Sequence, residues 1–250
     1  MVEALKSRVS DVILYLFALL AKDASEMKGT GPLLVIAPHP DDDILSCGAT
    51  IARARQAGLT VAVVYVTDGS ASSVSASISP AALVAMRALE AEAALDVLGC
   101  PAGTARFLNV PDNHAQGNIA GIAEQLRSII VELKPRRICS PYGIDPHPDH
   151  RAVAEAVRLL LQDGSITCEL FEYPRFQPIS AVSHLFNPAI WSRLRSVQAD
   201  DLIQLKASAL RLHRTQCENI TGETEWQTLP AHWVRMFFNN QELFLEKSRT

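Results

Sequence analysis

The 250 residues alternate between short apolar runs and longer segments with helical periodicity, and this alternation is the strongest constraint on the fold. Runs such as "LLVIA" (33–37) and "TVAVVYVT" (60–67) are apolar at almost every position, which is typical of strands buried on both faces. Each run is followed by a segment typical of a helix. Strands that alternate with helices require right-handed crossovers. We therefore predict an α/β fold with a Rossmann-like, doubly wound, mostly parallel sheet and helices on both faces.

The alternation continues to residue 173, and the rest of the chain is less regular. With 48% hydrophobic residues, the chain can bury one large core, so we predict a single domain over residues 31–250. Residues 180–250 are expected to add a loop-rich cap and one helix at about 200–214 to that domain. The predicted strands are 33–37, 60–67, 106–109, 136–140 and 167–173, and the predicted helices are 44–56, 80–98, 118–133 and 151–162.

The N-terminal residues 1–30 are predicted to form an apolar helical extension. The run "VILYLFALLA" (12–21) has about ten residues, which is too short to span a bilayer. Acidic residues in the leader, and Lys22 and Asp23 where small residues should mark cleavage, disfavour a signal peptide. We expect a cytoplasmic protein. Residues 2–22 are available for peripheral membrane association or self-association, between which the sequence does not choose, and the oligomeric state stays open.

Charge and cysteine content restrict the partners. A formal net charge of -4 provides no general attraction for phosphate backbones, so nucleic acid is not expected as a partner. A small molecule or glycoconjugate is the expected substrate. The five cysteines are odd in number and form no C-x-x-C pair, which predicts reduced thiols inside the fold.

Two loops that follow predicted strands concentrate acidic and histidine side chains. The segment "PHPDDD" (38–43) follows the strand 33–37, and "PYGIDPHPDH" (141–150) follows the strand 136–140. If the strand order is 3-2-1-4-5, these strands are neighbours at the crevice where such sheets bind ligands. Carboxylates gathered there repel one another, so a cation is the natural compensator. Two histidines and one carboxylate would leave an open coordination position, as in catalytic metal sites.

These motifs resemble the LmbE/PIG-L family of metal-dependent N-acetylglucosaminyl deacetylases. The resemblance covers about residues 32–220 and departs from the usual pattern at Pro38, where the family has alanine, and at Asp43, where it has glutamate. The shorter carboxylate at Asp43 is expected to weaken a supporting contact or alter helix capping. Further matching segments are "VTDG" (66–69), "RALE" (87–90), "FLNVPD" (107–112), "FEYP" (171–174) and "KASALRLHRTQ" (206–216).

The resemblance implies a set of site residues. Asp41 would be the general base, and His147 would polarise the substrate, with Asp149 or Asp145 orienting the His147 ring. The expected ion is Zn²⁺, although iron(II), cobalt or manganese suit the same nitrogen and oxygen ligands. Arg87, Asp112 and Asp68 resemble positions that contact the sugar, although salt bridges or turns explain them equally well. The implied metal ligands are His39, Asp42 and His150.

The predicted reaction is hydrolysis of an N-acetylated amino sugar. Metal-activated water would attack the acetamide while Asp41 removes its proton, and the metal and a protonated His147 would stabilise the oxyanion. Two alternatives stay open. Iron(II) oxygenases use similar ligands but need a second vacant position. A non-catalytic nucleotide or phosphate binder is disfavoured because the chain lacks both G-x-G-x-x-G and a P-loop.

Overall fold

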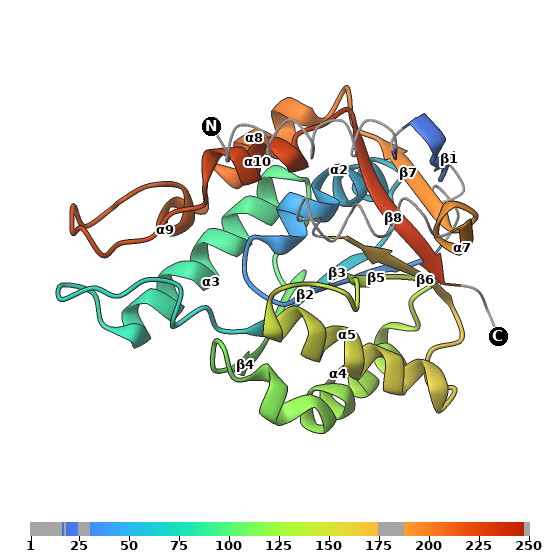
Figure 1. Ribbon diagram of the computed structural model, residues 1–250, viewed down its shortest axis with the longest axis horizontal. Helices are drawn as coiled ribbons and strands as arrows, with labels where there is room; N and C mark the ends of the chain where they lie inside the picture. The colour runs from blue at the N-terminus through green and yellow to red at the C-terminus, as the bar shows by residue number, and fades with distance from the viewer. Residues whose placement is uncertain (1–16, 18, 25–30, 175–187, 248–250) are drawn as a thin grey trace.

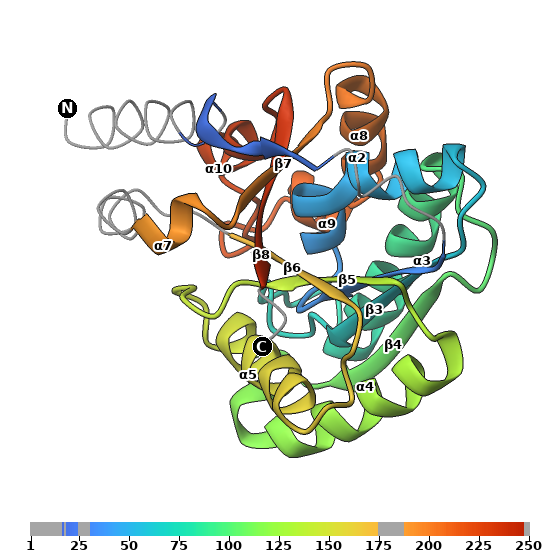
Figure 2. The same cartoon turned by 90° about the vertical axis from the view of Figure 1, so that its right-hand side faces the viewer.

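The computed structural model describes residues 17, 19–24, 31–174 and 188–247, and its centre is one sheet with helices on both faces (Figures 1 and 2). The strand order is β1-β7-β8-β6-β5-β2-β3-β4. The strands are β1 (Lys22–Asp23), β2 (Leu33–Ala37), β3 (Val61–Thr67), β4 (Ala105–Val110), β5 (Arg137–Pro141), β6 (Glu169–Tyr173), β7 (Leu194–Gln198) and β8 (Gln241–Lys247). The helices are α2 (Asp42–Gln56), α3 (Pro80–Val97), the 3-10 turn η2 (Ala115–Asn118), α4 (Ile119–Leu133), α5 (Pro148–Gln162), α7 (Pro188–Trp191), α8 (Ile203–Leu210), α9 (Arg214–Cys217) and α10 (Ala231–Phe237).

The five strands β4-β3-β2-β5-β6 pair in parallel, which confirms the doubly wound sheet and the order 3-2-1-4-5. β2 and β5 are neighbours, and the strand order reverses between them. The loop after β2 leads into α2 on one face of the sheet, whereas the loop after β5 leads into α5 on the other (Figure 2). Both loops leave at the same sheet edge because the strands are parallel. The topology therefore brings residues 38–41 and 142–147 together.

Two hydrophobic cores explain why the central strand β2 is apolar at every position. Leu33, Val35 and Ala37 point into the core formed with α2, α3 and α8. Leu34 and Ile36 point into the core formed with α4 and α5. Alternate side chains of a strand face opposite sides of a sheet, so a strand covered on both sides must be apolar throughout. Figure 1 shows these two helical layers above and below the sheet.

The C-terminal region differs from the predicted loop-rich cap because it extends the sheet. β8 pairs antiparallel with β6 and with β7, and β7 pairs in parallel with β1. The helix expected at about 200–214 is divided into α8 and α9. A short alternating segment such as "QELFLEK" (241–247) does not reveal its pairing partner, because that partner, β6, lies about 70 residues earlier. The division into a domain and an N-terminal extension stays a prediction.

The predicted N-terminal helix lies mostly outside the described residues. Within the described part of the chain, no helix has the length and apolar character needed to cross a bilayer. The five cysteines are free thiols, and three of them (Cys47, Cys100 and Cys139) are buried.

Candidate active site

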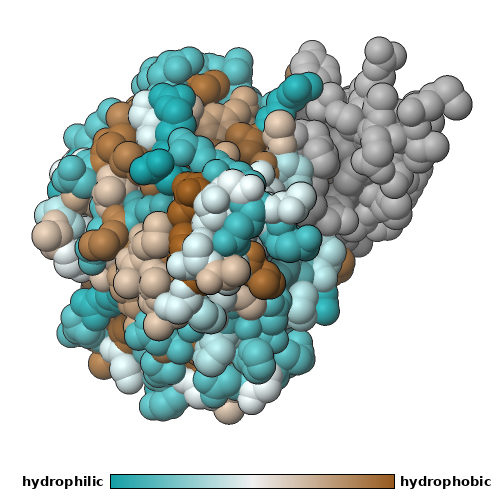
Figure 3. Space-filling view, turned by 90° about the vertical axis from the view of Figure 1, so that its left-hand side faces the viewer, coloured by the Kyte–Doolittle hydropathy of each residue, from teal (hydrophilic) through white to brown (hydrophobic). Residues whose placement is uncertain are grey.

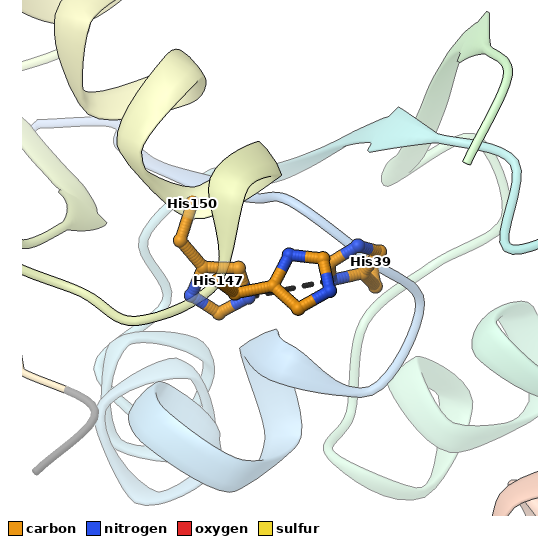
Figure 4. A group of neighbouring side chains, drawn as sticks. All are labelled: His39, His147 and His150. Atoms are coloured by element: carbon orange, nitrogen blue, oxygen red, sulfur yellow. Dashed lines mark hydrogen bonds between the residues drawn. The ribbon is translucent and has the colours of Figure 1, made fainter. Parts of the chain in front are cut away.

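Three donor atoms meet where the loops after β2 and β5 converge. Asp42 Oδ2 lies 3.1 Å from His39 Nδ1 and 3.1 Å from His150 Nε2. The two imidazole nitrogens are 3.3 Å apart. Ligands about 2.1 Å from a tetrahedral ion are separated by roughly 3.4 Å, so this triangle has the size of one face of a metal coordination sphere. The three implied ligands are thus brought together, and Figure 4 shows the imidazoles gathered at the start of α5.

The electrostatics of the triangle also favour a cation. Burial alone would lower the pKa of His39, but its hydrogen bonds with Asp112, Asp149 and Asp42 raise that pKa well above the usual value. Burial likewise opposes the charged form of Asp42, yet the neighbouring imidazoles hold the pKa of its carboxyl well below normal. The cluster therefore stabilises positive charge strongly. A divalent cation bound at the triangle would compensate the carboxylate charge in the same way as protons on the two histidines.

Each candidate ligand histidine is held by a carboxylate at its other nitrogen. His39 Nε2 lies 3.3 Å from Asp149 Oδ2 and 3.3 Å from Asp112 Oδ1. His150 Nδ1 lies 3.1 Å from Asp145 Oδ2. A proton shared at these outer nitrogens leaves the lone pairs of the inner nitrogens directed at the common point. Both histidines are therefore held in the tautomer that a metal ligand needs. The donor set fits a divalent metal.

Asp149 and Asp145 do not orient the His147 ring as the sequence suggested. Asp149 bonds His39 and also accepts hydrogen bonds from the backbone N–H groups of Asn113 (2.8 Å) and Ala115 (3.1 Å). Burial opposes ionisation of Asp149, but these bonds outweigh it and lower the pKa to about 2. Asp145 accepts the backbone N–H of His147 at 2.8 Å. The side chains of these carboxylates bond the candidate ligands, His39 for Asp149 and His150 for Asp145.

His147 is the N-cap of α5 and lines the cavity beside His39, with their ring centroids 4.7 Å apart. Its Nδ1 accepts the backbone N–H of Asp149 at 3.3 Å, so the neutral ring carries its proton on Nε2. Burial, followed by the nearby imidazoles of His39 and His150, lowers the pKa of His147 to about 4. The protonated His147 expected from the sequence is therefore disfavoured, and the ring acts as a neutral N–H donor.

Asp41 occupies a strained position at the N-cap of α2. Its φ angle is +134°, a conformation that residues with a Cβ rarely adopt. The side chain is 5% exposed and lines the cavity. The strain persists only because its surroundings hold the loop in place, and such backbone outliers concentrate at functional sites. The geometry is consistent with the role of base inferred from the resemblance.

Arg87 from α3 holds the Asp41 loop. Its Nη2 donates to Pro40 O at 2.7 Å and lies 3.6 Å from Asp41 Oδ2, while Nη1 donates to Gly69 O at 3.4 Å. Gly69 has a φ angle of +67°, and a Cβ there would collide with the Arg87 guanidinium. Arg87 is 1% exposed, although it borders the cavity. These contacts within the protein give Arg87 a structural role in holding the Asp41 loop. That role does not depend on the predicted sugar contact.

The other two predicted sugar contacts have different surroundings. Asp112 lines the cavity, where Oδ1 faces His39 Nε2 and Oδ2 accepts the backbone N–H of Ala71 at 3.2 Å. Asp68 Oδ1 accepts the backbone N–H groups of Ser70 (2.9 Å) and Asp112 (3.0 Å). Asp68 is absent from the described lining of the cavity. It therefore ties the loop after β3 to the loop after β4.

Asp43, the departure from the family pattern, lies behind the site. It is fully buried, and its Oδ2 accepts the Tyr65 hydroxyl at 2.8 Å, while Oδ1 has no hydrogen-bond partner. Burial raises the pKa of Asp43 to about 7. The shorter carboxylate is thus used to anchor α2 to β3.

The site opens into a cavity of about 390 Å³. Several residues of its wall were not predicted from the sequence. Gln216 belongs to the matching segment 206–216, and Ser72 lies in the Ser-rich loop after β3, but only the fold brings them to the site. These unpredicted wall residues are Ser72, Asn113, Gln216, Gln227, Thr228, Leu229 and Pro230.

Comparisons with known proteins agree with this geometry. A 1D-myo-inositol 2-acetamido-2-deoxy-alpha-D-glucopyranoside deacetylase of Nocardia farcinica is 34% identical over an alignment of 165 residues that covers 54% of this chain and 54% of that protein. The match thus spans about half the length of this relative. A probable N-acetyl-alpha-D-glucosaminyl L-malate deacetylase 2 of Bacillus anthracis is 24% identical over 84% of this chain and 98% of its own length.

The fold also matches a solved structure, the N,N'-diacetylchitobiose deacetylase of Pyrococcus horikoshii. The TM-score is 0.69 at 21% identity, over 99% of this chain and 92% of that protein. The family model described as PIG-L, GlcNAc-PI de-N-acetylase, matches residues 34–161. This range includes both converging loops and slightly more than half of the chain. The chain belongs to the PIG-L (LmbE-like) family.

Proposed function

We propose that this protein is a metal-dependent hydrolase that removes the acetyl group from an N-acetylglucosamine conjugate. The observation that carries the proposal is the triangle of His39, Asp42 and His150 donors at the base of a cavity that Asp41 and His147 also line. The named relatives act on N-acetylated glucosaminyl substrates, and the shared motifs extend that chemistry to this chain. Zinc is the proposed ion because the set of two imidazoles and one carboxylate suits it.

A divalent ion at the triangle would lower the pKa of a bound water from about 16 to about 7 and polarise the acetamide oxygen. Asp41 lines the cavity, lies outside the donor triangle and faces the Arg87 guanidinium at 3.6 Å. It takes the proton as the water oxygen forms its bond to the acetyl carbon. The same proton then passes to the amide nitrogen as the carbon–nitrogen bond breaks. Acetic acid and a primary amine are the products. The second proton of the water ionises from the acid to the solvent or the amine as acetate leaves, so atoms and charge balance.

His147 contributes as a donor rather than as an acid. Its neutral ring directs Nε2–H toward the oxygen that becomes negative in the tetrahedral intermediate, because Nδ1 is occupied by the Asp149 backbone N–H. A preorganised donor of this kind is typically worth about 10² to 10³ in rate. Arg87 supports the step indirectly by keeping Pro40 O and Asp41 in place.

The test is acetate and primary-amine release from N-acetylglucosamine conjugates by the purified protein, with its metal content measured. Equal yields of the two products, lost after chelation and restored by zinc, are expected. If the metal-loaded protein bound a nucleotide or inorganic phosphate tightly and released no acetate from any conjugate, the non-catalytic alternative would replace the proposal. Oxygen consumption without acetate would support an oxygenase instead.

A further inference from the structure

The far wall of the cavity consists mainly of uncharged polar groups. Ser72 comes from the loop after β3, Asn113 from the loop after β4, and the remainder from residues 216–230. Hydroxyl and carboxamide groups both donate and accept hydrogen bonds, which matches the hydroxyls of a sugar or cyclitol. Leu229 and Pro230 add apolar surface suited to the C–H faces of such rings.

This wall is held in position by contacts between its two main segments. Ser73 Oγ accepts the backbone N–H of Gln227 at 3.1 Å and donates to Gln227 O at 3.0 Å. Leu229 N donates to Gln216 O at 2.7 Å, and Gln216 Nε2 lies 3.4 Å from Ser72 Oγ. The two segments project together on the left of Figure 1, and Figure 3 shows hydrophilic and apolar residues interleaved on that side. The polar groups are therefore preorganised for a ligand.

The charges of the described lining leave no cation for an anionic group. Apart from the imidazoles of the candidate site, Arg87 is the cation of that lining, and it is 1% exposed and donates to Pro40 O and Gly69 O. The carboxylates of Asp41, Asp42 and Asp112 also line the cavity. A divalent ion and Arg87 would balance these three charges. The described lining therefore has no positive charge left to pair with a carboxylate or phosphate on the substrate, and such a group would be held there without a partner.

We propose that the group attached to N-acetylglucosamine in the substrate is an uncharged, hydroxyl-rich ring, a sugar or cyclitol, and that carboxylate- or phosphate-bearing groups are rejected. The inference rests on the proposed function and narrows its substrate class. It predicts that the substrate preference of this chain differs from that of the relative named for an L-malate conjugate. The preference would resemble that of the relatives named for inositol and chitobiose conjugates.

The first experiment compares N-acetylglucosamine conjugates of inositol, of a second N-acetylglucosamine and of L-malate. We expect kcat/KM to be about 10 to 100 times higher for the two neutral conjugates, because the described lining offers the malate carboxylates no cationic partner. Equal or faster turnover of the malate conjugate overturns the inference and leaves the deacetylase proposal intact. Acetate release from none of the three overturns the proposed function itself.

The second experiment adds the missing cation. Thr228→Lys places an ammonium group in the wall, and Thr224→Lys makes the same change at an exposed residue outside the described lining. The ratio of malate to inositol kcat/KM should rise about tenfold in Thr228→Lys relative to Thr224→Lys. The same ratio in both variants would contradict the inference.

A binding measurement tests the inference without requiring turnover of the substrate. Calorimetry with zinc-loaded Asp41→Asn should give a lower Kd for the inositol conjugate than for the malate conjugate, by a similar factor of about 10 to 100. The opposite order of affinities, or equal affinities, would overturn the inference even if turnover were slow for other reasons.

Discussion

The base and the wall of the cavity are built in opposite ways. The base, residues 38–42 and 145–150, lies at the ends of buried strands and the first turns of α2 and α5, and its charged side chains are almost fully enclosed. The wall is built from residues 71–73 and 216–230, which are largely loops, and the members of these segments that line the cavity are uncharged. Charged groups on helices and strands are suited to holding a metal and a reacting group in fixed positions. Neutral groups on loops are suited to binding the hydroxyls of a substrate ring. We expect changes in the base to affect metal and rate, and changes in the wall to affect substrate affinity.

The largest expected effect is loss of the metal from the base. His150→Ala removes one of the three donor atoms and leaves the Asp145 carboxylate without its imidazole partner. Metal content and acetate release should both fall below detection, as measured by elemental analysis and product assay. His114→Ala changes an exposed histidine near the same loops and should retain both. Normal metal content in His150→Ala would remove this residue from the coordination sphere.

Asp41→Asn tests whether chemistry can be separated from metal binding within the base. A general base typically contributes about 10² to 10⁴ in rate, so kcat should fall by that factor. The metal should remain, because Asp41 is not part of the donor triangle. Elemental analysis of the same preparation provides the control. Unchanged kcat in this variant would assign proton removal to another group.

Asp149→Asn tests the carboxylate behind His39. Loss of its charge weakens the bond to His39 Nε2 and should lower metal affinity by about 10- to 100-fold, measured by competition with a chelator. Asp163→Asn removes a surface carboxylate of similar type that pairs with Arg127, and it should leave the affinity unchanged. If Asp149→Asn instead altered only the rate at full metal occupancy, the sequence-based role in orienting His147 would be restored.

Gln216→Ala tests the wall. Its amide donates to Ser72 Oγ and Thr215 O and borders the cavity, and one such hydrogen-bonding group is worth about 1 kcal/mol. KM should rise by less than about tenfold, with metal content and kcat nearly unchanged. Gln204→Ala on the exposed side of α8 is the matched control. Loss of metal in Gln216→Ala would mean that wall and base are not independent.

The smallest expected change concerns the protonation of His147. Because its pKa is lowered to about 4, the ring should stay neutral, with its proton on Nε2, from pH 8 down to about pH 5. Nitrogen chemical shifts of this ring should therefore be constant over that range. Titration of His147 near pH 6.5 would restore the protonated form expected from the sequence.

The sequence alone determined the part of this protein that depends on local pattern. The alternation of strands such as 33–37 and 136–140 with helices predicted a parallel sheet, and a parallel sheet places the following loops at one edge. That is why the meeting of the two loops could be predicted without coordinates, whereas the choice of His39, Asp42 and His150 as metal ligands came from the family resemblance. Helix periodicity and strand burial are properties of neighbouring residues, and the LmbE/PIG-L motifs lie within those same segments.

Tertiary structure decided what depends on partners distant in sequence. The strand 241–247 is identified only by its pairing with β6 and β7, and the wall exists because Ser73 meets Gln227. The partners of Asp149 and Arg87 also became clear only in the fold, where Asp149 bonds to His39 and Arg87 bonds to Pro40. A side chain's hydrogen bonds depend on distances of about 3 Å between segments far apart in the chain. No local pattern of residues encodes those distances.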